Sequence, residues 1–344
     1  MNTKIIETKV ICSRPEQMYG WPGITKAANG DILVAASERK FHMCPFGREI
    51  IIRSKDNGKT WNLPEEVYNG ELDDRDANLL RMDDDTIILS WFSSTAFKDI
   101  WADRFENISS DSIDKLTGTW MIKSFDNGIT WEREKSRLPV GIHISPVQLS
   151  DKSLITIGPE NPSESDSLSV YKSNDQGVNW YKTSEIDGYP ILNENHVIET
   201  EPGCLLALIR SRDFLYKATS KDYGKTWTKP EATQICGFPA QMLKLKDGRI
   251  LCSYSSRKPP YSIKAVLSND NGETWDTDNT IILYSFEDEP DMGYPSSIEL
   301  DENEIFTVFY VSRRDANLPE SHLKHHPQIV GFSPEGIISI RFKI

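Results

Sequence analysis

The sequence predicts an all-β protein: a six-bladed β-propeller with four-stranded antiparallel blades. Two interleaved repeats and an excess of Trp carry this prediction. The chain of 344 residues contains nine Trp, although aromatic residues make up 10% of it. Five of the nine end copies of one motif, Ser-x-Asp-x-Gly-x-(Thr/Asn)-Trp, which we call the Asp box. The boxes lie at 54–61, 124–131, 173–180, 220–227 and 268–275.

Each Asp box is expected to form a hairpin turn. The Asp carboxylate can accept backbone N–H groups within the turn, the Gly can adopt a positive φ, and the Trp can cover the turn with apolar surface. Because this chemistry is complete within the motif, we predict a structural role for the boxes.

The second repeat is a polar turn followed by a short apolar strand. Box starts are separated by 70, 49, 47 and 48 residues, and each interval holds one such turn. That spacing is typical of a propeller blade of about four short strands. Six turns and five boxes predict six blades, the sixth without a box. The turn segments are NGDILVAA (29–36), DDTIILSW (84–91), DKSLITIG (151–158), PGCLLALI (202–209), DGRILCSY (247–254) and ENEIFTVF (302–309).

The long first interval and the chain ends complete the predicted architecture. Residues 95–118 are expected to form an insertion on one face, with a short helical turn. The strand around 5–11 is expected to pair with the C-terminal segments VGF and IISIRFKI, because an open ring would leave bare sheet edges. No linker or shift in composition divides the chain, so one domain over 1–344 is predicted.

Composition limits the partners. Lys and Arg number 39 against 52 Asp and Glu, a net charge of −13, which argues against nucleic acid or an anionic membrane as the main partner. No apolar run approaches the roughly 20 residues of a membrane helix, and MNTKIIETKVIC lacks the apolar core of a secretory signal. Five scattered cysteines without metal-ligand spacing predict reduced thiols, a cytoplasmic location and no metal. The oligomeric state is left open.

The repeats resemble the Asp-box propellers of the sialidase (neuraminidase) superfamily, from about residue 15 to 310. GYPSSIELDENEIFTVFY (293–310) is similar to the segment that holds the nucleophilic tyrosine of that family, which places Tyr294 there. NENHVIETEPGCLLALIR (193–210) is similar to the segment with the catalytic glutamate and one carboxylate-binding arginine, which places Glu194 and Arg210. A phenol is a poor nucleophile until a carboxylate takes its proton, so the pair suits covalent catalysis.

The chain departs from the family pattern at three positions. Where sialidases carry the Arg of Phe/Tyr-Arg-Ile-Pro, this chain has Gly20. Cys44 falls near the expected acid/base Asp. The last arginine of the family triad falls near Tyr261, where Arg257 is the closest arginine and Lys264 the closest cation on the following strand. The resemblance places Arg39 on another active-site arginine. A weakened guanidinium grip on a carboxylate indicates a substrate other than an ordinary sialoside.

A charged cluster in the first two blades offers replacements for the missing groups. His42 could act as general acid or base near neutral pH. Asp74 or Asp76 competes for that role if a dry pocket raises its pKa. The plainer alternatives are a loop-anchoring His42 and a solvated turn at DDRD; His143 and His196 are weaker candidates near strand starts. The cluster comprises Glu38, Arg39, His42, Arg48, Glu49, Asp73, Asp74, Arg75 and Asp76.

Three functions remain open at this point. The first is a retaining exo-glycoside hydrolase for a terminal acidic sugar, with Arg39, Arg75, Arg210, Arg257 and Asp74 as substrate contacts. It needs no metal or organic cofactor, because its chemistry is proton transfer and covalent catalysis. The second is a glycan-binding propeller without catalysis. The third is a hydrolase or lyase for uronate or other keto-acid sugars. In each, the partner is a small glycoside or oligosaccharide.

Overall fold

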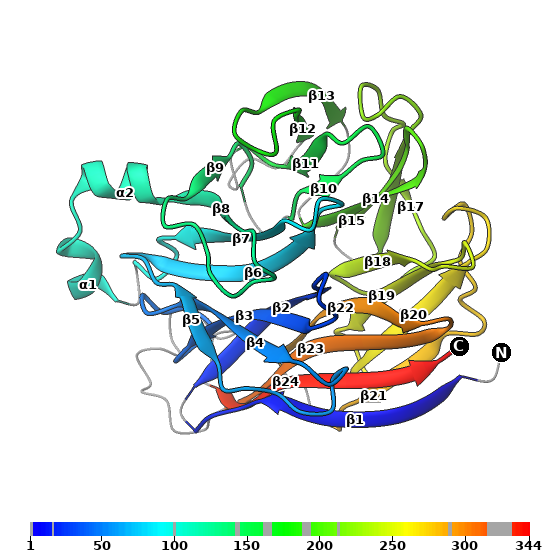
Figure 1. Ribbon diagram of the computed structural model, residues 1–344, viewed down its shortest axis with the longest axis horizontal. Helices are drawn as coiled ribbons and strands as arrows, with labels where there is room; N and C mark the ends of the chain where they lie inside the picture. Colours follow the sequence, from blue (N-terminus) through cyan, green and yellow to red (C-terminus); the bar gives the residue numbers. More distant parts are fainter. Residues whose placement is uncertain are drawn as a thin grey trace.

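Six four-stranded antiparallel sheets surround a central channel (Figure 1). The computed structural model describes residues 3–15, 17–98, 101–141, 145–160, 167–187, 194–211, 214–287, 291–314 and 332–344. The first strand of every blade contributes residues to the channel wall. This arrangement confirms the predicted six-bladed all-β propeller.

The first five blades each follow chain order from the channel outwards. Blade 1 contains β2 (Met18–Lys26), β3 (Ile32–Arg39), β4 (Arg48–Ser54) and β5 (Glu65–Tyr68). Blade 2 contains β6 (Asp73–Arg81), β7 (Ile87–Ser94), β8 (Gly118–Ser124) and β9 (Ser136–Leu138). Blade 3 contains β10 (Val147–Gln148), β11 (Leu154–Gly158), β12 (Ser167–Ser173) and β13 (Tyr181–Asp187). Blade 4 contains β14 (Asn195–Glu201), β15 (Cys204–Arg210), β16 (Leu215–Ser220) and β17 (Glu231–Ala232). Blade 5 contains β18 (Ala240–Lys244), β19 (Ile250–Ser256), β20 (Ser262–Ser268) and β21 (Ile281–Ser285).

The sixth blade joins the two ends of the chain. It contains β22 (Asp291–Asp301), β23 (Glu304–Arg314), β24 (Phe332–Lys343) and, as its outer strand, β1 (Lys4–Cys12). The register of β1 on β24 runs from Lys4 opposite Lys343 to Cys12 opposite Ile337, and Figure 1 shows the blue strand beside the red one. The predicted closure by the terminal strands is confirmed.

The Asp boxes connect the third and fourth strands of blades 1 to 5. In the box of blade 2, the Ser124 hydroxyl donates to Asp126 at 2.8 Å and accepts from the Gly128 N–H at 2.8 Å. The Asp126 carboxylate also accepts from the N–H and hydroxyl of Thr130, at 2.8 and 2.6 Å. The five boxes share this pattern, except that in blade 3 the side-chain amide of Asn179 replaces the Thr hydroxyl. Their glycines have φ between 76° and 86°. The predicted turn chemistry is therefore confirmed.

The boxes and the candidate site residues lie on opposite faces. Since the strands alternate in direction, the connections from first to second and from third to fourth strand share one face. The connections from second to third strand, and from blade to blade, share the other. Helices α1 (Ala102–Glu106) and α2 (Ser110–Leu116) lie in the β7–β8 connection, on this second face. They confirm the helical insertion predicted at 95–118.

Three further predictions concern membrane helices, the cysteines and the number of domains. Among the described residues, no helix is long and apolar enough to cross a membrane. The five cysteines form no disulfide in the described part of the chain. The assignment of one domain to 1–344 stays a prediction.

Candidate active site

Tyr294 and Glu194 meet at the mouth of the channel. The Tyr294 hydroxyl donates to Glu194 Oε1 at 2.6 Å, and Arg210 Nη1 donates to Glu194 Oε2 at 2.6 Å. Glu194 directly precedes β14, where its carbonyl accepts from the Arg210 N–H at 2.7 Å. The pairing of β14 with β15 thus fixes both side chains. Burial and the Glu194 charge raise the pKa of Tyr294 well above its usual range, so Glu194 is the natural acceptor of its proton.

Tyr294 has a backbone conformation that non-glycine residues rarely adopt. Its φ is +54°, and it lies in an irregularity of β22 between Gly293 and Ser296. A non-glycine residue with positive φ costs of order 1–3 kcal/mol and persists only when its surroundings require it. The bulge takes Tyr294 out of the regular alternation of the strand.

Two guanidinium groups flank this pair. The Arg257 guanidinium lies 5.7 Å from the centre of the Tyr294 ring, and its Nη2 donates to the Met292 carbonyl at 3.0 Å. The Phe238 ring lies 4.2 Å from the Arg210 guanidinium and 5.9 Å from that of Arg257. Two cations beside the phenol and glutamate form a site suited to an anionic group.

Trp21 packs in the middle of the remaining site residues. Its ring makes edge contacts with His42 and Tyr294, at centroid distances of 5.1 and 6.4 Å. The guanidinium groups of Arg39 and Arg75 lie 4.8 and 4.4 Å from the ring centre. Trp21 has a φ of +52° and lies in a bulge of β2. An aromatic ring therefore occupies the centre of the site, next to Gly20, where the family pattern has an arginine.

Arg39 and Arg75 are anchored within the protein. The Arg39 side chain is 0% exposed; it pairs with Asp73 and also donates to the carbonyls of Asp74 and His42, both at 3.1 Å. Arg75 Nη1 lies 3.7 Å from Asp73 and donates to the Met43 sulfur at 3.0 Å. These contacts indicate that the two arginines support Trp21 and the loop of His42. The sequence predicted that they would contact the substrate directly.

His42 belongs to a hydrogen-bonded chain that the sequence did not indicate. Its Nδ1 lies 2.7 Å from Asp291 Oδ2, and the Tyr310 hydroxyl donates to Asp291 Oδ1 at 2.8 Å. Burial favours the neutral form of Asp291, but His42, Arg257 and Tyr310 outweigh it and lower the pKa of Asp291 to about 2. Asp291 is therefore a carboxylate throughout the physiological pH range.

Asp74 and Asp76 lie in different surroundings. Burial raises the pKa of Asp74 to about 6, in the predicted direction. Its carboxylate accepts from Trp91, Ser93 and the Gly70 N–H at 3.2, 2.5 and 2.6 Å, so it is engaged with blade 2 and the loop before β6. Asp76 is buried at the start of β6 with a φ of +64°, and its negative charge helps to raise the pKa of Tyr294. Of the two carboxyl groups, Asp76 is therefore the one whose charge acts on Tyr294.

Several weaker candidates lie elsewhere or have other partners. Cys44 is fully buried. Lys264 lies within β20, opposite Tyr254. Arg48 pairs with Glu38 at 3.2 Å near the outer rim of blade 1. His143 lies outside the described residues.

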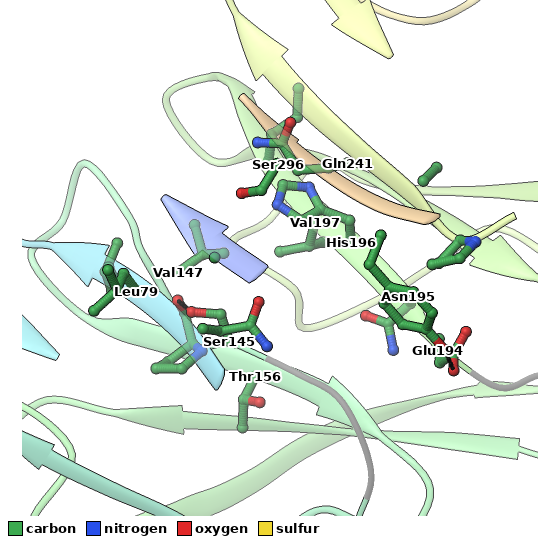
Figure 2. Close-up of a pocket in the computed structure, with 18 of the residues that line it drawn as sticks. Leu79, Ser145, Val147, Thr156, Glu194, Asn195, His196, Val197, Gln241 and Ser296 are labelled. Atoms are coloured by element: carbon green, nitrogen blue, oxygen red, sulfur yellow. Dashed lines mark hydrogen bonds between the residues drawn. The ribbon is translucent and has the colours of Figure 1, made fainter. Parts of the chain in front are cut away.

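A cavity of about 240 Å³ lies along the channel, and Glu194 and Tyr294 form part of its wall. Figure 2 shows Glu194 followed by Asn195 and His196 on one side. Burial lowers the pKa of His196 to about 4, so its imidazole is neutral near pH 7. Within the described part of the chain, no group of three or more His, Cys, Asp or Glu residues could hold a metal ion.

The fold is a six-bladed propeller, and Tyr294, Glu194 and Arg210 meet at one end of its channel. The model of the BNR repeat-like domain matches residues 75–307, and the chain belongs to this family of sialidase-related propellers. A sialidase of Bacteroides fragilis is 28% identical over an alignment of 159 residues, which covers 42% of this chain and 28% of that protein. The chain thus matches less than a third of its curated relative.

Solved structures share the fold, and two of them illustrate the likeness. A Dyadobacter fermentans protein of unknown function has a TM-score of 0.79 at 22% identity, and the alignment covers 99% of both chains. The NanB sialidase of Streptococcus pneumoniae has a TM-score of 0.68 at 14% identity, over 98% of this chain and 70% of that one. At these identities the likeness concerns the fold, and activity must be argued from the site.

Sequence analysis missed four residues of the site. Trp21 directly follows Gly20 but was given no role, and Asp291, Tyr310 and Phe238 were not considered. Asp291 lies three residues before Tyr294, so an acidic residue at the start of the tyrosine strand was a usable signal. Tyr310 lies opposite Gly293 on β23, a relation that requires the strand register.

Proposed function

We propose that this protein is a retaining exo-glycoside hydrolase that acts on a terminal acidic sugar. The carrying observation is the 2.6 Å hydrogen bond from the Tyr294 hydroxyl to Glu194. Glu194 accepts the phenolic proton while the Tyr294 oxygen attacks the anomeric carbon and the bond to the leaving oxygen breaks. An acid group protonates that oxygen. Water then cleaves the tyrosyl–sugar bond with the same group acting as base.

Arg210 and Arg257 are proposed to hold the anionic group of the sugar. Both guanidinium groups lie beside Tyr294 and Glu194, and Arg210 is 26% exposed. Arg210 also forms an ion pair with Glu194 at 2.6 Å. A cation at this distance favours the ionised carboxylate, which is the form that can accept a proton. For the acid, the geometry favours His42 or Asp76 over Asp74, whose oxygens accept hydrogen bonds from Trp91, Ser93 and Gly70.

Substitution of the nucleophile tests the proposal. Tyr294→Phe removes the attacking oxygen and keeps the ring, so we expect kcat to fall about 10³-fold or more on any glycoside that the wild type cleaves. Tyr216→Phe, on β16 outside the site, is the matched control and should retain activity. The proposal fails if Tyr294→Phe stays within twofold of the wild type.

The glycine at position 20 favours two other functions. With Trp21 rather than a third guanidinium group at the centre, the anionic grip depends on two arginines, which suits a glycan-binding protein without catalysis. It equally suits a hydrolase or lyase for uronate or keto-acid sugars. Calorimetric binding of acidic sugars and product analysis on a panel of sialosides and uronides separate the three functions. Binding without turnover supports the glycan-binding protein. Turnover of uronides alone supports the hydrolase or lyase for uronate or keto-acid sugars. Cytoplasmic residence stays a prediction.

A further inference from the structure

We propose that Asp291 and Tyr310 are positioning residues that hold His42 as the proton donor to the leaving oxygen. This inference rests on the glycosidase function proposed above. It assigns a task to a buried carboxylate that the tyrosine–glutamate chemistry does not use. It also supplies the acid that the family pattern lacks at Cys44.

Both carboxylate oxygens of Asp291 are engaged. Oδ2 lies 2.7 Å from His42 Nδ1, and Oδ1 accepts from the Tyr310 hydroxyl at 2.8 Å. Since Asp291 is ionised, it can only accept, so Nδ1 of His42 carries a proton in this arrangement. The second ring nitrogen, Nε2, is left as the atom that gains or loses a proton. A carboxylate that fixes one imidazole nitrogen in this way sets the tautomer and the orientation of the ring.

The exposed fractions of the two side chains support an orientation in which Nδ1 of His42 faces Asp291 and Nε2 faces the solvent. The His42 side chain is 27% exposed, whereas that of Asp291 is 9% exposed. The ring thus bridges a buried carboxylate and a solvent-accessible surface. His42 also packs edge-on against Trp21 at 5.1 Å, a contact that limits rotation of the ring.

His42 and the nucleophile share their neighbours. One Trp21 ring contacts both His42 and Tyr294, at 5.1 and 6.4 Å between centroids. The Tyr294 and Tyr310 rings lie 6.0 Å apart. The proton donor and the attacking oxygen therefore flank one aromatic group, as expected for groups that act on one glycosidic bond.

Two carboxylates from different strands act on His42. Asp291 from β22 contacts it directly, and Asp73 from β6 interacts with it electrostatically. Asp73 is already paired with Arg39 and lies near Arg75. Arg257 from the β19–β20 connection helps to lower the pKa of Asp291, and Arg39 donates to the His42 carbonyl. Asp291 is therefore the carboxylate whose removal should change the imidazole most.

The proton balance follows from this geometry. Protonated His42 gives its Nε2 proton to the glycosidic oxygen as the carbon–oxygen bond breaks, and the ring becomes neutral. Nε2 then takes a proton from the water that cleaves the tyrosyl–sugar bond, which restores the imidazolium, while Glu194 returns its proton to the departing Tyr294 oxygen. Asp291 keeps its charge and its contact with the Nδ1 proton throughout.

Leaving groups of different basicity test the inference. A nitrophenolate departs without a proton, whereas a sugar hydroxyl needs one. We expect Asp291→Asn and His42→Gln to lower kcat/KM for a disaccharide by about 10²-fold or more, and at least tenfold less for the nitrophenyl glycoside. In Asp291→Asn, the alkaline limb of the pH profile should move to lower pH. Tyr310→Phe, which keeps Asp291, should show a smaller loss of the same kind.

A spectroscopic measurement needs no substrate. In ¹⁵N-histidine-labelled protein, with His42 assigned by loss of its signals in His42→Gln, the neutral ring should carry its proton on Nδ1. In Asp291→Asn this tautomer preference should weaken, and Tm should be recorded to verify folding. A neutral His42 protonated on Nε2, or equal losses for both leaving groups, would overturn the inference. If Tyr294→Phe is inactive while those losses are equal, the glycosidase function stands and only the proton-donor assignment fails.

Discussion

Trp21 shows how one side chain defines this site. Its ring contacts His42 and Tyr294, and the guanidinium groups of Arg39 and Arg75 stack on it. Cation–π contacts of buried guanidinium groups contribute up to about 2 kcal/mol each. The two arginines thereby stabilise an apolar floor instead of reaching for a ligand. Recognition of an anion is left to Arg210 and Arg257.

At the residue scale, the buried carboxyl group of Glu49 should make the stability of the protein depend on pH. It is fully buried, and the Ser37 hydroxyl lies 3.0 Å from both of its oxygens. Burial and the Asp74 charge raise the pKa of Glu49 well above its usual range. The folded protein thus keeps a proton that the unfolded chain loses, so stability falls as pH rises from the usual range of glutamate through the folded pKa.

Glu49→Gln should relieve this penalty. We expect the variant to gain about 1 kcal/mol or more over the wild type at pH 8, and less at pH 5, in urea unfolding. Glu66→Gln, an exposed partner of Arg48, is the control and should change stability by about 0.5 kcal/mol at most. A Glu49→Gln effect that does not vary with pH would contradict the explanation.

At the scale of elements, each Asp box couples two blades. A Cβ added to the box glycine of any of blades 1 to 5 would meet a side chain of the preceding blade. The contacts are Gly58 with Phe306, Gly128 with Leu33, Gly177 with Met121, Gly224 with Ile155 and Gly272 with Leu206. The boxes therefore close hairpins and also pack neighbouring blades together, on the face opposite the site.

Two glycines with nearly equal backbone angles separate these roles. Gly272 has φ +85°, and a Cβ there would lie 2.2 Å from a Leu206 methyl; Gly248 has φ +91° with nothing within 4 Å. We expect Gly248→Ala to cost about 1 kcal/mol from backbone strain alone. Gly272→Ala should cost about 2–4 kcal/mol, because overpacking adds to the strain. Equal losses in urea unfolding would show that the box does not couple blades 4 and 5.

At the scale of the whole molecule, one face of the propeller gathers the site. Its residues come from the ends of second strands and the starts of first strands in blades 1, 2, 4, 5 and 6. The net charge of −13 opposes an anionic substrate at long range. The arginines of the mouth must therefore act locally, where screening by salt weakens the repulsion of the remaining surface.

Removal of β1 should lower the melting temperature, because this strand closes the ring. β1 is the outer strand of the sixth blade and carries the buried residues Ile11 and Cys12. A variant that lacks residues 1–12 exposes the edge of β24, and we expect Tm to fall by roughly 10 °C or more. Val10→Thr, at an exposed position of β1, is the control and should melt near the wild type. Equal melting of the truncated and full chains would show that β1 does not contribute to closure.

The sequence alone determined the blade count, the box turns, the closure of the ring and the meeting of Tyr294 with Glu194 and Arg210. Closure of the ring was expected because an open ring would leave bare sheet edges, and the meeting of Tyr294 with Glu194 and Arg210 was implied by the resemblance to sialidases. The blade count and the box turns are written in a local pattern, turns of eight residues that repeat. Such patterns depend on hydrogen bonds and φ preferences within a few residues of one another, so they survive without knowledge of the fold.

Only the tertiary structure decided how the remaining residues are used. His42 and Asp291 are 249 residues apart, and their contact arises because blades 1 and 6 are neighbours in the closed ring. Arg39 was expected at the substrate, but burial against Asp73 and under Trp21 directs it inward. Side chains at a propeller mouth converge from separate blades. Which of them face the ligand is therefore set by strand register, bulges and burial, and these depend on packing across the whole ring.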